Sequence, residues 1–167
     1  MNHKKILYYG GQKSGKSSFA ERRTLELSQN SKPFYVATYN NSYSDEEMQE
    51  RIGKHKKQRE EKFITIEEPF NLVKVIQSDE TYLIDCISMW LLNNLHKEEE
   101  ELLKELETLA KTNANMVFVL NNVNEGVIPL DKESRKFVDL TGIIGQKLAS
   151  LCDEVYEVKL GIGVQIK

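Results

Sequence analysis

A glycine-rich octapeptide near the start of the chain constrains the fold more than any other part of the sequence. It consists of Gly10, Gly11, Gln12, Lys13, Ser14, Gly15, Lys16 and Ser17, which matches the pattern GxxxxGK[ST]. The apolar run Ile6–Tyr9 leads directly into it, and the helical segment Ser17–Gln29 leads directly out. In such loops, backbone N–H groups turn inward around phosphate oxygens, and the helix N-terminus adds partial positive charge. Because a chance match would lack this flanking strand and helix, the loop is predicted to bind nucleotide phosphates.

Three side chains have an expected role at such a loop. Lys16 is expected to reach the β- and γ-phosphates, and the Ser17 hydroxyl to bind Mg²⁺. Enzymes with this loop usually place an aspartate after a second strand, where it orients the same metal. Asp85 directly follows the apolar run Tyr82–Ile84 and fits that role. The alternative is that Asp85 caps the next helix, which is predicted to start near Ser88.

Short apolar runs alternate with helical patterns along the chain. The strand candidates are Ile6–Tyr9, Phe34–Thr38, Tyr82–Ile84 and Met116–Leu120, and helical stripes cover Ser17–Gln29, Glu98–Lys111 and Glu133–Leu151. This alternation predicts an α/β fold of the RecA-like P-loop NTPase class, with a mostly parallel sheet flanked by helices. Apolar residues around Gly161 and Gly163 predict a C-terminal antiparallel hairpin. At 167 residues, the chain is expected to form one nucleotide-binding domain, residues 1–167.

Composition excludes several classes of protein. Lys+Arg 23 against Asp+Glu 26 gives a net charge of −3, without the basic excess of a nucleic-acid binder. No apolar run approaches the ~20 residues of a membrane-spanning helix. The basic start of the chain is followed by an apolar run shorter than the ~7–15 residues of a signal peptide core. Cys86 and Cys152 are too few for a disulfide framework, so a reducing cytoplasm is expected.

A second candidate site lies on a basic helix predicted between residues 44 and 58. Residues 44–47 form a capping-box pattern, Ser-Asp-Glu-Glu, at its start. Arg51, His55 and Arg59 recur every four residues, so they share one stripe of the helix. The residues alone leave two interpretations of His55. It is a packed histidine on a solvated basic helix, or a nucleophile whose neutral imidazole attacks phosphorus while nearby cations lower its pKa.

Taken in order, these segments resemble the bifunctional adenosylcobinamide kinase / adenosylcobinamide-phosphate guanylyltransferases of cobalamin biosynthesis. The resemblance runs from Ile6 to Lys167, nearly the whole chain. It is carried by Gly10–Ser17 with Ala20-Glu21, Tyr35–Thr38, Asp45–Met48 with Arg51-Ile52 and His55, Leu83–Cys86, Trp90-Leu91, Asn93–Leu95, Gly126–Pro129, Arg135, Phe137, Asp139, Gly142, Gln146, Asp153–Val155 and Gly161. The Arg-Ile-x-x-His segment is far more specific than the phosphate loop, which many families share.

The resemblance implies two successive reactions. The first phosphorylates the aminopropanol hydroxyl of adenosylcobinamide from ATP or GTP, and the second transfers GMP from GTP to that phosphate, releasing pyrophosphate. In the family the second reaction passes through a GMP–histidine intermediate, and His55 matches that histidine. Lys16 and Ser17 match the phosphate-binding pair, Asp85 matches the acidic group near Mg²⁺, and a homotrimer is implied. Contacts to the nucleotide are implied for Ala37, Thr38, Tyr39, Arg51, Lys56, Lys57, Gln58, Arg59 and Glu67, with Glu68 as the alternative to Glu67.

Four positions depart from the family pattern. Asn122 replaces a glutamate, Asn124 a glycine, Gly145 an asparagine and Lys13 an arginine. These changes concern the corrinoid pocket or the balance of the two activities. Rival interpretations therefore stay open: a P-loop small-molecule kinase without the guanylyl step, a nucleotide-dependent switch, or a degenerate nucleotide-binding subunit. A GTPase switch would normally carry Asn-Lys-x-Asp, which the segment 121–124 lacks.

Overall fold

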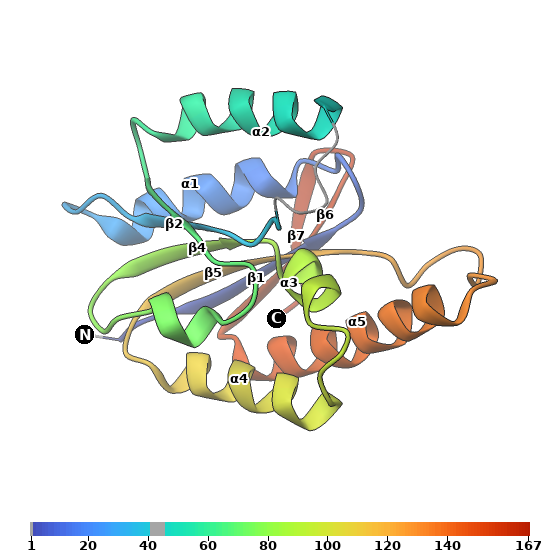
Figure 1. The fold of residues 1–167 in the computed structure, drawn as a ribbon. Helices are drawn as coiled ribbons and strands as arrows, with labels where there is room; N and C mark the ends of the chain where they lie inside the picture. Colours follow the sequence, from blue (N-terminus) through green and yellow to red (C-terminus); the bar gives the residue numbers. More distant parts are fainter. Residues whose placement is uncertain (1, 41–45) are drawn as a thin grey trace.

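A mostly parallel β-sheet forms the centre of the molecule. The computed structural model describes residues 2–40 and 46–167, without the side chains of Met48, Gln49, Arg51, Ile52, Lys54, His55 and Gln58. In this part of the chain, seven strands pair in the order β3-β2-β4-β5-β1-β6-β7 (Figure 1). They are β1 (Lys5–Gly10), β2 (Phe34–Ala37), β3 (Ile64–Glu67), β4 (Thr81–Asp85), β5 (Asn115–Asn121), β6 (Glu154–Lys159) and β7 (Ile162–Gln165). All neighbours are parallel except the β6–β7 hairpin, so the predicted α/β class is confirmed.

Helices cover both faces of this sheet. They are α1 (Lys16–Ser28), α2 (Glu46–Arg59), α3 (Ile87–Asn93), α4 (Glu99–Lys111) and α5 (Lys132–Leu151), with a short 3-10 helix, η2 (Leu72–Val75). Figure 1 shows α1 on one face with α2 beyond it on the same side, and α4 and α5 on the opposite face. Among the described residues, no helix is long and apolar enough to cross a bilayer.

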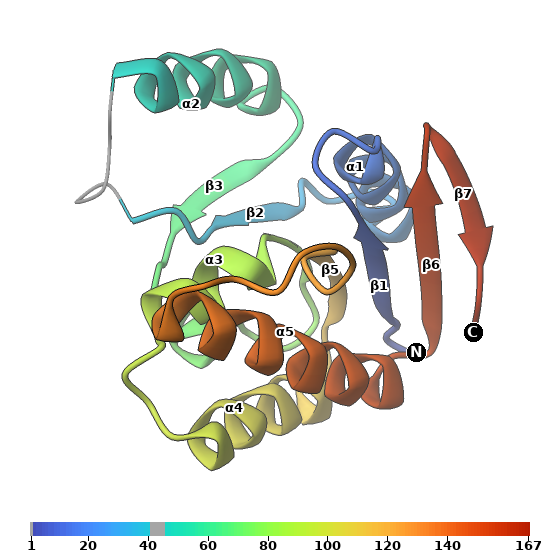
Figure 2. The same cartoon turned by 90° about the vertical axis from the view of Figure 1, so that its right-hand side faces the viewer.

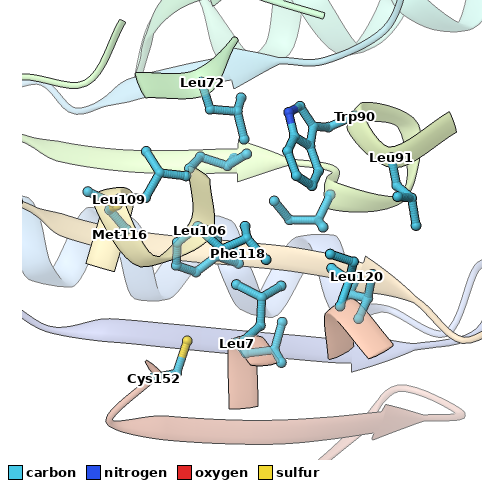
Figure 3. Close-up of a cluster of buried hydrophobic side chains, with 14 of the residues drawn as sticks. Leu7, Leu72, Trp90, Leu91, Leu106, Leu109, Met116, Phe118, Leu120 and Cys152 are labelled. Atoms are coloured by element: carbon cyan, nitrogen blue, oxygen red, sulfur yellow. The ribbon is translucent and has the colours of Figure 1, made fainter. Parts of the chain in front are cut away.

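Two apolar clusters hold these layers together. The larger one lies between the sheet and helices α3, α4 and α5, and includes the fully buried Trp90 (Figure 3). The smaller one lies under α1 and includes Tyr8 and Tyr35. Successive residues of β1 alternate between them, because side chains along a strand point to opposite faces. Since both faces are covered, the central strands are nearly continuous apolar runs, and each large buried side chain contributes about 1.5–3 kcal/mol.

The parallel pairing determines where a ligand can bind. The carboxyl ends of β1, β2, β4 and β5 lie at one edge of the sheet, which faces the viewer in Figure 2. The connections that follow these strands therefore meet there, including the glycine-rich loop after β1. In open α/β sheets, ligands bind outside the carboxyl ends of the strands.

Candidate nucleotide-binding site

The glycine-rich loop has the turned-in backbone of a phosphate cradle. It joins β1 to α1, and the N–H of Ser14 donates to the Gly11 carbonyl at 3.2 Å, which closes a turn. Gly15 precedes α1 with φ 99°, a left-handed conformation that favours glycine. The Ser14 hydroxyl is buried and has no hydrogen-bond partner within the described part of the chain. A phosphate oxygen would satisfy this hydroxyl, since buried polar groups are normally paired.

The C-terminal hairpin, far away in sequence, supports this loop. The N–H of Gly161, in the turn between β6 and β7, donates to the Ser14 carbonyl at 2.8 Å. On the other side, the N–H of Asn122 after β5 donates to the Gly10 carbonyl at 2.8 Å. The sequence assigned no role at the site to Gly161. The glycine signal of a hairpin turn marks a turn, but it does not identify the segment on which the turn packs.

Replacing Gly10 with alanine is expected to destabilise the protein. A Cβ atom at Gly10 would lie 2.7 Å from the Ser14 hydroxyl oxygen and would clash with the Val158 carbonyl, which belongs to the backbone and cannot turn away. Overpacking of this kind costs about 1–3 kcal/mol. The matched control is Gly11→Ala, because a Cβ there has nothing within 4 Å. Urea unfolding of both variants checks this, and equal losses would contradict the packing described.

Lys16, the first residue of α1, is buried beside the loop. Its ammonium donates to the Gly11 carbonyl at 3.0 Å. Burial lowers the pKa of Lys16 from its ordinary value, whereas the nearby Asp85 carboxylate acts in the opposite direction. Lys16 thus places a desolvated cation against the backbone of the loop. Phosphate oxygens are natural partners for such a charge, because they would replace the water that it has lost.

Asp85 ends β4, two strands away from β1, since β5 lies between them. Its Oδ2 accepts a hydrogen bond of 2.6 Å from the hydroxyl of Tyr35. Burial and the Asp85 charge raise the pKa of Tyr35 well above its usual value, so the phenol stays protonated and donates. Helix α3 is capped by Cys86, whose Sγ accepts from the N–H of Met89. The alternative role of Asp85 as the cap of this helix is therefore wrong.

The last residue of β2, Ala37, lies opposite Asp85 in the sheet, and it is followed by Thr38 and Tyr39, whose side chains have different environments. Thr38 is fully buried, and its hydroxyl donates to the Cys86 carbonyl at 2.7 Å and accepts from the Cys86 N–H at 2.9 Å. That side chain joins the ends of β2 and β4, and both of these hydrogen bonds are made to the protein backbone. Ala37 is half-buried, while the hydroxyl of Tyr39 is buried without a hydrogen-bond partner among the described residues.

Helix α2 carries the second group of candidate residues. It starts and ends within two residues of the predicted 44–58, although the predicted cap, Ser44, lies outside the described residues. Its backbone includes Arg51, His55 and Gln58, whose side chains are not among those described. The side chains of Lys56 and Lys57 are exposed. The Arg59 guanidinium, at the end of the helix, stacks over the Tyr35 ring at 3.8 Å from its centroid.

Two adjacent glutamates after β3 have different environments. The Glu68 carboxylate accepts hydrogen bonds from the N–H groups of Phe70 and Asn71, at 3.0 and 3.2 Å, so it orders its own loop. Glu67, at the end of β3, is exposed. Of the two, Glu67 is the one whose carboxylate is presented to solvent.

Three of the four positions that depart from the family pattern, Asn122, Asn124 and Gly145, make contacts within the fold. The Asn124 amide donates to the Val138 carbonyl at 2.8 Å, which fastens the loop after β5 to α5. The side-chain oxygen of Asn122 accepts from the N–H of Asn124 at 3.1 Å. A Cβ at Gly145 would lie 3.3 Å from Leu120, so glycine lets α5 approach β5 closely.

The chain was compared with known proteins. Residues 6–166 match the family model described as cobinamide kinase / cobinamide phosphate guanyltransferase. The chain belongs to this family. The bifunctional adenosylcobalamin biosynthesis protein CobP of Pseudomonas aeruginosa is 32% identical over 170 residues, covering 96% of each chain. The corresponding protein CobU of Escherichia coli is 32% identical over 184 residues, covering 97% of this chain and 99% of the relative.

Solved structures agree with the family's fold. The flagellar accessory protein FlaH from Methanocaldococcus jannaschii aligns with a TM-score of 0.53 at 14% identity, covering 100% of this chain and 80% of that one. The PH0250 protein from Pyrococcus horikoshii aligns with a TM-score of 0.55 at 11% identity, covering 98% of this chain and 86% of that one. Likeness at such identities concerns the architecture alone, which agrees with the predicted α/β fold of a mostly parallel sheet flanked by helices.

Proposed function

We propose that this chain catalyses two successive transfers: phosphorylation of adenosylcobinamide from a nucleoside triphosphate, and transfer of GMP from GTP to the resulting phosphate. The observation that carries this is membership of the cobinamide kinase / cobinamide phosphate guanyltransferase family over residues 6–166, with relatives of nearly equal length. The phosphate loop has the backbone that such a reaction needs. The whole chain then acts as one nucleotide-binding domain.

In the first transfer, the residues of the loop hold the triphosphate. The Ser14 hydroxyl and the loop N–H groups donate hydrogen bonds to its oxygens, and the Lys16 ammonium neutralises charge as the γ-phosphoryl group leaves. Such chemistry depends mainly on positioning and charge, so the rigid support of the loop by Gly161 serves it directly.

The donor set also suits Mg²⁺. The exposed Ser17 hydroxyl and the Asp85 carboxylate are hard oxygen ligands, and Mg²⁺ is usually bound by one or two such groups together with substrate phosphates. The described residues contain no group of three or more His, Cys, Asp or Glu that could hold a metal ion by themselves. Held by Ser17 and Asp85, the ion would supply positive charge that offsets the charge of the phosphates.

In the second transfer, His55 acts as the nucleophile. A neutral ring nitrogen attacks the α-phosphorus of GTP, a nitrogen–phosphorus bond forms, and the bond to the pyrophosphate oxygen breaks. The phosphate of the acceptor then attacks the same phosphorus and releases the histidine. Exposed Lys56 and Lys57 offset the charge of the phosphates beside it. Ala37, the Tyr39 hydroxyl, Arg51, Gln58 and Glu67 are proposed to contact the guanine nucleotide, whereas Thr38 contributes through its backbone position.

Both transfers are tested together by one assay. Purified protein is incubated with adenosylcobinamide, ATP, GTP and Mg²⁺, and the products are analysed by mass spectrometry. We expect adenosylcobinamide phosphate first and adenosyl-GDP-cobinamide later, with one pyrophosphate released for each GMP transferred. Accumulation of the phosphate alone would support the rival kinase without a guanylyl step. Absence of both products, despite nucleotide binding, would favour the degenerate subunit.

Asp85→Asn is expected to raise the Mg²⁺ concentration needed for half-maximal phosphorylation by about 10-fold or more, because a neutral amide is a poor ligand for a hard cation. The matched control is Asp79→Asn, since Asp79 precedes β4 at the opposite end of the strand and is exposed. Steady-state rates against Mg²⁺ concentration measure both variants. Identical curves for wild type and Asp85→Asn would remove Asp85 from the metal site.

We also propose a cytoplasmic homotrimer. The apolar side chains Ile162, Val164 and Ile166 are exposed on the edge strand β7 and just after it, and an exposed apolar edge favours contact with another chain. The described cysteines, Cys86 and Cys152, are both free and buried, which fits a reducing compartment. Sedimentation equilibrium tests the trimer, and a monomer at micromolar concentration would contradict it.

A further inference from the structure

Tyr35 is the buried side chain that fixes the orientation of the Asp85 carboxylate. It lies on β2, whose next neighbour in the sheet is β4, and the register places Ala37 opposite Asp85. The Tyr35 hydroxyl therefore reaches along the strand and donates to Asp85 Oδ2 at 2.6 Å. A hydrogen bond to a charged acceptor is short and strong, about twice as strong as one between neutral groups. It holds one carboxylate oxygen, Oδ2, whereas no hydrogen bond to the Oδ1 side-chain oxygen is present among the described residues.

The Tyr35 ring is itself held from two directions. The Arg59 guanidinium lies over its face, 3.8 Å from the centroid, and Phe63 meets it edge-on at 6.0 Å with an interplanar angle of 77°. A cation over a phenol ring is attracted to the ring's electrons, and hydrogen-bonded chains of polar groups strengthen one another. Arg59 is the last residue of α2, the helix that carries His55. One chain of contacts thus runs from α2 through Tyr35 to Asp85.

We propose that Tyr35 is a positioning residue for the metal–nucleotide complex, and that Arg59 acts on this site through Tyr35. Partners that orient a metal ligand typically contribute 10- to 100-fold to metal affinity. Binding of the metal–nucleotide complex at the carboxyl edge of the sheet is then energetically linked to the position of the C-terminal end of α2. The inference rests on the proposed role of Asp85, and it assigns to Tyr35 and Arg59 a role distinct from contact with the nucleotide.

The direct test is Tyr35→Phe, which removes one oxygen and keeps the ring under Arg59. The probe is Mn²⁺ binding in the presence of a non-hydrolysable GTP analogue, measured by electron paramagnetic resonance, with analogue binding without metal measured separately. We expect metal affinity to fall about 10-fold or more while metal-free analogue affinity stays within twofold. The matched control is Tyr82→Phe on the adjacent strand, whose hydroxyl accepts from the N–H of Gln77, away from the site. Equal metal affinity in Tyr35→Phe and wild type would overturn the proposal.

Arg59→Ala tests the second part of the proposal in two backgrounds. In the wild type, it is expected to weaken Mn²⁺ binding about threefold. The cation–π contact between Arg59 and Tyr35 contributes less free energy than the hydrogen bond from Tyr35 to the charged Asp85. In the Tyr35→Phe background, it is expected to change metal affinity by less than 1.5-fold, because the route through the hydroxyl is already lost. The same loss in both backgrounds would show that Arg59 acts independently of Tyr35.

Asp85→Asn separates failure of this inference from failure of the proposed function. If Asp85→Asn leaves Mn²⁺ affinity unchanged, the metal assignment itself is wrong. If Asp85→Asn weakens metal binding and Tyr35→Phe does not, the metal assignment stands and the positioning role is refuted.

Discussion

Lys16→Ala is expected to lower the rate of adenosylcobinamide phosphorylation by about 10²–10³-fold, the usual cost of removing one preorganised group that stabilises transition-state charge. The Lys16 ammonium is already desolvated beside the phosphate loop, so it meets developing negative charge without first losing water. Steady-state kinetics with saturating Mg²⁺ and nucleotide measure the effect. The matched control is Lys111→Ala, because Lys111 lies exposed at the end of α4, away from the loop.

This loss of activity should not be accompanied by a loss of stability. Burial lowers the pKa of Lys16, which means that the charged form is disfavoured in the free protein. Removing such a charge is therefore expected to leave the free energy of unfolding unchanged or to raise it. If Lys16→Ala instead unfolded at clearly lower urea concentration, the lysine would be a structural group, and its catalytic assignment would lose its main support.

His55→Ala is expected to reduce GMP transfer by at least about 10³-fold, because a covalent step without its nucleophile has no substitute route. Phosphorylation of adenosylcobinamide should stay within about threefold of wild type, since the phosphate loop lies on other elements, β1 and α1. The two products are followed separately by chromatography. Loss of both activities to the same degree would make His55 a structural residue of α2, and loss of neither would favour the rival kinase without a guanylyl step.

The parts of the fold that the sequence predicted well are those with local signals. Strand β1, the glycine-rich loop and helix α1 follow one another without interruption, and helix α4 carries an apolar stripe on one side. Their predicted ends differ from the observed ones by at most one residue. Strand β3 was not predicted, because only four residues at the edge of the sheet form it, and such a short run is not distinct from a loop.

The candidate site was predicted through its motif, and its supporting contacts were not. Tyr35 and Asp85 are 50 residues apart in sequence. Gly161 and the phosphate loop that it contacts lie near opposite ends of the chain. Such pairs depend on strand order, which no local pattern encodes. The same reason explains why the sequence did not predict that the Thr38 hydroxyl joins the ends of β2 and β4, while contact of Thr38 with the nucleotide stays a prediction.

The most direct test of the central claim is covalent labelling with GTP that carries a radioactive α-phosphate. Wild type and His55→Ala are incubated with it and Mg²⁺, denatured and separated from free nucleotide. We predict label on the wild type that survives base and is lost in mild acid, as a histidine phosphoramidate should be, and no label on His55→Ala. An unlabelled wild type that nevertheless binds GTP, or equal labelling of the variant, would contradict a GMP–histidine intermediate at His55.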